Sequence, residues 1–244
     1  MLNKLILGLF FALPPSCVAQ APGLLNALKS GDWTVRMNAF YQLRKSTMSE
    51  ATQSAILQLL ERESQESMKQ EAAADRLVWK PQEGTAGEAH GEYYGDLVRT
   101  VASLHTEKAA QILAAAVGGG KMIDDEMVRW PKAVTPLLLN QMLTSQSLRQ
   151  RVNSSHRLAV VLTNSEARKQ LNAQQIREIM QGFERILADE IPIMRITAVS
   201  AYESLSDVSK IPALRQMARD DPDSGVRRVA QRAAAALETL RNKK

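Results

Sequence analysis

One pattern of five residues recurs along this chain and constrains its fold more than any other feature. It consists of a branched or long apolar residue, then arginine, then two residues, then alanine. The pattern occurs at Val35-Arg36, Val98-Arg99, Met194-Arg195 and Val226-Arg227. The arginines lie 63, 96 and 32 residues apart, close to two, three and one steps of 32. A period of this length is typical of a fold made from stacked copies of one short unit.

The residues around the pattern indicate that the units are helical. Ala, Leu, Gln, Arg, Glu and Met are abundant, and all favour helices. No segment shows the sustained alternation of apolar and polar residues that strands show. An aspartate stands four residues before three arginines of this kind, in the pairs Asp32 and Arg36, Asp125 and Arg129, and Asp223 and Arg227. We expect these aspartates to accept hydrogen bonds at helix N-termini.

We expect the arginines to link neighbouring units. The apolar residue before each arginine would pack inward, and the alanine one turn later would let the next helix approach closely. A guanidinium at this position would reach an acidic cap in the adjacent unit through charge-assisted hydrogen bonds. The sequence therefore predicts a structural arginine ladder, formed by Asp32, Arg36, Arg99, Asp125, Arg129, Arg195, Asp223 and Arg227.

Three segments carry the pattern most fully, and they reveal a family resemblance. Residues 221–237, 31–43 and 191–205 resemble the second helix of HEAT and HEAT-like repeats. The match weakens in the middle, where Trp130-Pro131 interrupts a helix expected from residue 124 to about 142. The resemblance implies an α-solenoid that serves as a binding scaffold. Some members of the family are chromophore lyases or DNA glycosylases, but this chain has no residue signature of either.

The fold that we expect is therefore all-α. It would be a right-handed α-solenoid of stacked antiparallel helix pairs, forming an armadillo-type superhelix. We expect the following divisions: a signal peptide at 1–19, N-terminal HEAT-like helices at 20–79, an inserted loop at 80–91, degenerate repeats at 92–190, C-terminal HEAT-like repeats at 191–240 and a basic tail at 241–244.

The first residues have the layout of a secretory signal peptide. Lys4 precedes an apolar run over residues 5–13, and small residues at Cys17 and Ala19 favour cleavage after Ala19. The apolar run is too short to span a membrane. A lipoprotein is the alternative, but Pro14 stands where a lipidation motif usually has leucine. We therefore expect export, to the periplasm or the medium.

The cysteine count and the charge exclude several classes of protein. Cys17 is the single cysteine, so cleavage after Ala19 would leave no disulfide and no cysteine-based site. The formal net charge of +5 is spread over many arginines rather than gathered in a dense basic stripe. This distribution argues against a nucleic-acid partner. It leaves open weak binding to an anionic component of the cell envelope.

The sequence shows no convincing catalytic motif. The histidines His90, His105 and His156 form no metal-binding motif. The run Gly118-Gly119-Gly120-Lys121 lacks the spacing of a phosphate-binding loop. We therefore expect no catalytic residue, metal or cofactor. The alternative is an enzyme whose site, in the atypical middle repeats, pairs these histidines with nearby carboxylates.

Aromatic residues near the expected loop are the candidates for partner binding. Trp79, Tyr93, Tyr94 and Trp130 stand out because aromatics are scarce here and often anchor partners. Packing of the loop against its own helices is the alternative. The sequence as a whole predicts an exported HEAT-like scaffold that binds a protein or peptide partner and does not catalyse a reaction.

Overall fold

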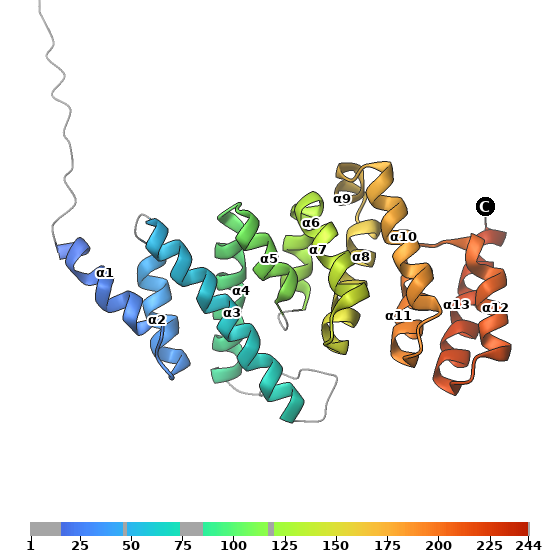
Figure 1. The fold of residues 1–244 in the computed structure, drawn as a ribbon, viewed down its shortest axis with the longest axis horizontal. Coiled ribbons are helices and arrows are strands. Elements are labelled where there is room, and N and C mark those ends of the chain that lie inside the picture. The colour runs from blue at the N-terminus through green and yellow to red at the C-terminus, as the bar shows by residue number, and fades with distance from the viewer. Residues whose placement is uncertain (1–15, 46–47, 74–84, 117–119, 244) are drawn as a thin grey trace, which may run out of the picture. The chain divides into compact units, whose positions relative to one another are not determined.

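The structure, a computed structural model, describes residues 16–45, 48–73, 85–116 and 120–243 (Figure 1). Within these ranges the chain forms helices joined by turns, and no strand is present. The helices are α1 (Ser16–Ala27), α2 (Trp33–Arg44), α3 (Glu50–Ala73), α4 (Thr85–Ser103), α5 (Glu107–Ala115), α6 (Lys121–Arg129), α7 (Pro131–Thr144), α8 (Leu148–Thr163), α9 (Ser165–Gln170), α10 (Ala173–Leu187), α11 (Pro192–Ser204), the short 3-10 helix η1 (Val208–Lys210), α12 (Ile211–Asp220) and α13 (Ser224–Asn242).

The chain divides into two compact units, Met1–Leu59 and Leu60–Lys244. The boundary falls inside α3, so it differs from the divisions expected at residues 79, 91 and 190. The signal peptide expected at 1–19 lies mostly outside the described residues, and Ala19 lies in α1. No helix in the described ranges has both the length and the apolar character needed to cross a membrane.

The first unit begins with the helices α1 and α2, which pack together. Asp32 is the N-cap of α2 and accepts a hydrogen bond from the Thr34 backbone N–H at 2.8 Å. Ala39, Phe40 and Leu43 of α2 are buried. Their spacing places them on one face of the helix, which is the amphipathic pattern that the sequence indicates.

The second unit ends in two helix pairs, α10 with α11 and α12 with α13 (Figure 1). The loops within the pairs are short, as in antiparallel helix hairpins. α11 packs on both α8 and α13, so the second helices of successive pairs stack directly on one another. A buried cluster fills the space between these helices, made of Val199, Ile211, Leu214, Ala230, Ala233, Ala234 and Leu237. Its alanines allow the close approach of α11 and α13.

Two expected elements differ from the structure. The helix expected from residue 124 to about 142 is two helices, because Pro131 has no backbone N–H to donate and starts α7 instead. α4 begins at Thr85, so the later part of the loop expected at 80–91 is helical. Residues 85–91 thus continue into the buried helix rather than forming a separate insertion.

The prediction of an all-α fold made of stacked helix pairs is confirmed for the described residues. The repeat period is visible in the C-terminal pairs, where α11 and α13 start 32 residues apart. The right-handed superhelix stays a prediction.

Candidate functional site

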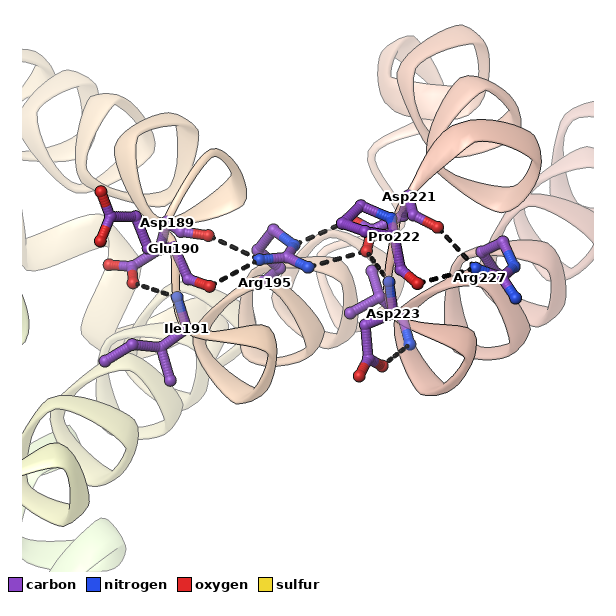
Figure 2. A network of polar contacts seen from close by, with 9 residues as sticks. Asp189, Glu190, Ile191, Arg195, Asp221, Pro222, Asp223 and Arg227 are labelled. Carbon is purple, nitrogen blue, oxygen red and sulfur yellow. Dashed lines mark hydrogen bonds and ion pairs between the residues drawn. The ribbon is translucent and has the colours of Figure 1, made fainter.

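The arginines of the repeat pattern make the same local contact in both C-terminal repeats (Figure 2). Arg195 Nη1 donates hydrogen bonds to the backbone carbonyls of Asp189 and Glu190, at 2.8 and 3.1 Å. Arg227 Nη1 donates to the carbonyls of Asp221 and Pro222, at 2.7 and 3.0 Å. In each repeat the arginine therefore satisfies the two loop carbonyls that lie five and six residues before it.

The same contact occurs in the first unit. Arg36 Nη1 donates to the carbonyls of Ser30 and Gly31, at 2.9 and 3.0 Å. The Arg36 residue is only 1% exposed, so it closes the turn before α2 from inside the protein. A buried guanidinium needs such acceptors, because an unpaired charge in the interior is costly.

One arginine also links two repeats, as the sequence suggests, although the acidic partner differs. Arg195 Nε and Nη2 donate to the two carboxylate oxygens of Asp221, at 2.8 and 2.7 Å. This bidentate pair lowers the pKa of Asp221. The helix cap Asp223 instead accepts the Val226 backbone N–H and donates its own N–H to Asp221 (Figure 2).

A second inter-repeat pair has no counterpart in the expected ladder. Arg151 of α8 pairs through Nη2 with the Asp189 carboxylate, and its Nε donates to the Met142 carbonyl at 3.1 Å. Asp189 in turn accepts the Ile191 N–H at 2.9 Å, as Asp221 accepts that of Asp223. Asp189 and Asp221 lie 32 residues apart. The 32-residue period therefore marks Asp189 as the counterpart of Asp221, but it does not mark Arg151, because Arg151 and Arg195 stand at different distances before their aspartates.

Three residues assigned to the ladder lie elsewhere in the structure. Arg99 is exposed and pairs with Asp96 on its own helix at 2.6 Å. Arg129 is likewise exposed and pairs with Glu126. Asp125 lies inside α6, whose N-cap is Gly120, and pairs with Lys121. Each of these contacts lies within a single helix, α4 for Arg99 and α6 for Asp125 and Arg129. This corrects the expectation that these three residues join repeats.

In the middle of the second unit a different arginine joins the helices. Arg157 of α8 is 4% exposed, and its Nη1 and Nη2 donate to the carbonyls of Ala114 and Ala116 at 3.1 and 2.8 Å. These carbonyls lie at the C-terminal end of α5. Asp124 of α6 lies 3.8 Å from Arg157 Nε. Arg157 therefore ties three helices together, and its position in the sequence does not follow the repeat pattern.

The histidines lie in separate places. His156 Nε2 lies 3.4 Å from Asp124, which raises the pKa of His156. His90 Nε2 lies 3.5 Å from the buried Glu63 carboxylate. His105 adopts a positive φ of 53° just after α4 and packs against Trp130, with ring centroids 4.5 Å apart and the ring planes tilted by 42°. No group of three or more metal-binding side chains occurs in the part of the chain that the structure describes.

The candidate aromatic anchors that the structure describes do not form an exposed surface. Tyr93 and Tyr94 are 0% and 4% exposed, which corrects the expectation that they face a partner. The Tyr93 hydroxyl donates to Glu63 at 3.0 Å, and burial raises the pKa of Tyr94 to about 12. Trp130 is half-buried between α6 and α7. Trp79 lies outside the described residues.

An open groove of about 400 Å³ lies between α10 and α12, the first helices of the last two pairs. Leu187, Ala213 and Met217 give it apolar walls, and Glu184, Asp220 and Asp221 are its charged residues. The described residues that line it include no lysine or arginine. The groove exists because α11 and α13 pack closely on their small side chains, whereas α10 and α12 remain apart. No sequence motif marks this site.

Comparisons with known proteins give only distant similarities. No protein-family model matches the sequence, and no curated protein matches it. One similar solved structure is an engineered protein from the Northeast Structural Genomics Consortium, with 17% identity, a TM-score of 0.40, and coverage of 90% of this chain and 97% of that one. Another is a designed armadillo repeat protein in complex with the peptide (KR)4, with 12% identity, a TM-score of 0.36, and coverage of 89% and 99%. Neither similarity assigns a ligand to this chain.

Proposed function

We propose that this chain is an exported HEAT-like scaffold that binds a protein or peptide partner and does not catalyse a reaction. The groove between α10 and α12 is the observation that carries the proposal. Concave surfaces with apolar walls and a few polar groups are the usual sites of ligand binding. The bidentate Arg195–Asp221 pair and the buried cluster beside it hold the two repeats together, so the groove has rigid walls.

The hydrogen bonds of the arginines in the repeat pattern favour a structural role for these arginines rather than a catalytic one. Arg36, Arg195 and Arg227 are engaged with loop carbonyls of their own repeats. His90 and His156 each face one carboxylate, and the groove contains no histidine among its described lining residues. This separation favours a binding scaffold over an enzyme in the middle repeats.

Selection of peptides on the full chain tests the binding proposal. A displayed peptide library is panned against the wild-type protein and against Ala213→Arg, which fills the groove with a long side chain. Ala235→Arg, at an exposed site on α13 outside the groove, is the matched control. We expect peptides that bind the wild type and the control and are lost on Ala213→Arg. Peptides retained equally by all three proteins would contradict the proposal.

The N-terminal sequence supports export, and a separate experiment tests it. The full chain is expressed in a bacterial host, and the N-terminus of the protein recovered outside the cytoplasm is determined by mass spectrometry. We expect the exported form to begin at Gln20, after cleavage at Ala19. Recovery of only the uncleaved chain in the cytoplasm would disprove export.

A further inference from the structure

We infer that the occupant of the groove is a cationic peptide segment in which lysine or arginine adjoins an apolar residue. This inference rests on the proposed function and adds the chemistry of the partner. It follows from the apolar walls of the groove, from its carboxylates and from the helix ends that border it.

The apolar walls of the groove are made by side chains that also pack against the buried core. Leu187 of α10 and Met217 of α12 are partly buried and pack against the buried cluster of the last two repeats. Each therefore presents its remaining surface to the groove. Methionine adapts its shape to different apolar partners, which suits a peptide-binding surface. An apolar side chain of a partner would be removed from water here.

The carboxylates of the groove differ in whether an ion pair within the protein already neutralises them. Asp221 is nearly buried and paired with Arg195, and Glu184 is half exposed and paired with Lys210. Asp220 is exposed and makes no ion pair with any residue that the structure describes. Its charge is therefore available to a partner. A lysine or arginine beside Asp220 would not have to displace an existing ion pair.

The helix ends add to this negative potential. α10 ends at Leu187 and α12 ends at Asp220, so the groove is bordered by the C-terminal ends of two helices. The unpaired carbonyls of a helix C-terminus carry partial negative charge, which attracts cations. The chain as a whole has a net charge of +5, whereas the described lining of the groove holds the unpaired Asp220 and no lysine or arginine. Charge complementarity therefore selects a basic segment over an acidic one.

Fluorescence anisotropy with purified full-length protein tests the inference. Three labelled peptides of equal length are compared, in which leucine alternates with lysine, glutamine or glutamate. We expect the lysine peptide to bind most tightly and the glutamate peptide most weakly, with the difference reduced at high salt. Asp220→Asn should weaken binding of the lysine peptide by about twofold to fivefold, the effect of one exposed charge pair. Asp125→Asn, an exposed carboxylate on α6, should leave binding unchanged.

The outcomes separate this inference from the proposed function. If the three peptides bind equally and all are lost on Ala213→Arg, the groove binds peptides but the inferred basic preference is wrong. If no peptide binds, or if Ala213→Arg has no effect, both proposals fail. Self-association that Ala213→Arg abolishes would identify a second copy as the occupant and overturn the inference. Circular dichroism checks that each variant is folded, and Gln216→Arg, at an exposed groove position, replaces Ala213→Arg if that variant unfolds.

Discussion

At the scale of single residues, the place of an arginine within its helix decides what it binds. Arg36, Arg195 and Arg227 lie in the first turn of their helices, so each reaches back to carbonyls of the preceding loop. Arg99 shares the sequence pattern but lies far inside α4. The carbonyls before it already accept hydrogen bonds within the helix. Arg99 therefore turns outward to Asp96.

Backbone strain at Ser206 gives a stability prediction. Ser206 is exposed and has a φ of 54° at the end of α11, a conformation that glycine adopts without steric cost. We expect Ser206→Gly to stabilise the protein by about 1 kcal/mol, measured as a rise in the thermal unfolding midpoint. Ser204→Gly, two residues earlier at the last residue of α11, should destabilise by about 0.5 kcal/mol. A fall in the midpoint for both variants would contradict this explanation.

The contact between His156 and Asp124 predicts a pH dependence. Asp124 raises the pKa of His156 above its ordinary value of 6.5, mainly through a hydrogen bond. The stabilisation from this contact is therefore fully present below pH 6.5 and is lost as pH rises through the higher, folded-state pKa. An NMR titration of the His156 ring should place its midpoint above 6.5, and Asp124→Asn should lower it. A midpoint at or below 6.5 in the wild type would rule out the contact in solution.

At the scale of elements, the spacing between helices follows from the size of the side chains between them. Ala198, Ala230 and Ala233 are fully buried where α11 approaches α13. The first helices carry larger residues such as Leu187 and Met217, which remain partly exposed along the groove. Close packing on one side and separation on the other create the groove that the proposed function uses.

The Arg195–Asp221 pair, which joins α11 to the turn between α12 and α13, should be the strongest polar link between the last two repeats. Its side chains are 10% and 6% exposed, so Asp221→Asn should destabilise the protein by about 3 kcal/mol, because it leaves a buried charge without its partner. The pKa of Asp221 is lowered from 3.8, so the stabilisation is present above pH 3.8 and is lost as pH falls through the folded-state value. Urea unfolding at neutral and acidic pH measures both effects.

A second ion pair between the same two repeats, from α11 to α13, is the control. Arg232 and Glu203 lie 3.1 Å apart, but their side chains are 65% and 28% exposed. Glu203→Gln should cost less than about 1 kcal/mol, as expected for a solvated pair. If Glu203→Gln and Asp221→Asn lower the free energy of unfolding equally, burial does not set the strength of these ion pairs.

At the scale of the whole molecule, the later helix pairs of the second unit contact mainly the pairs next to them along the chain. α13 packs on α11 and α12, and α11 packs on α8 and α10, while the core of the last two repeats consists of their own residues. In such an array stability is roughly the sum of each repeat and its contacts with adjacent repeats. The effect of a substitution should therefore remain near its own position.

Hydrogen exchange followed by mass spectrometry tests this locality within the second unit. Arg195→Ala should speed exchange in α11 and α13 and leave α4 to α6 protected, because its partners lie in the last repeats. Arg157→Ala should do the reverse, speeding exchange in α5, α6 and α8 and sparing α12 and α13. A uniform increase in hydrogen exchange across the second unit, in either variant, would show that the whole unit unfolds as one block.

The sequence by itself determined the helical class, the repeat at both ends of the chain and the caps Asp32 and Asp223. Periodicity and capping depend on residues a few positions apart, so they are visible in a linear sequence. The same reasoning did not foresee the break before Pro131 as a boundary between two helices or the burial of Tyr93 and Tyr94. Burial depends on which helix lies opposite, and no local pattern records that.

Only the tertiary structure decided the contacts between distant residues. It selected Asp221 rather than Asp223 as the partner of Arg195, joined Arg151 to Asp189, and brought Arg157 to the end of α5. It also opened the groove between α10 and α12, because the alanines of α11 and α13 let those helices approach while the first helices stay apart. The repeat pattern specifies how each unit closes its own turn, whereas the packing of one unit on the next specifies the surface available to a partner.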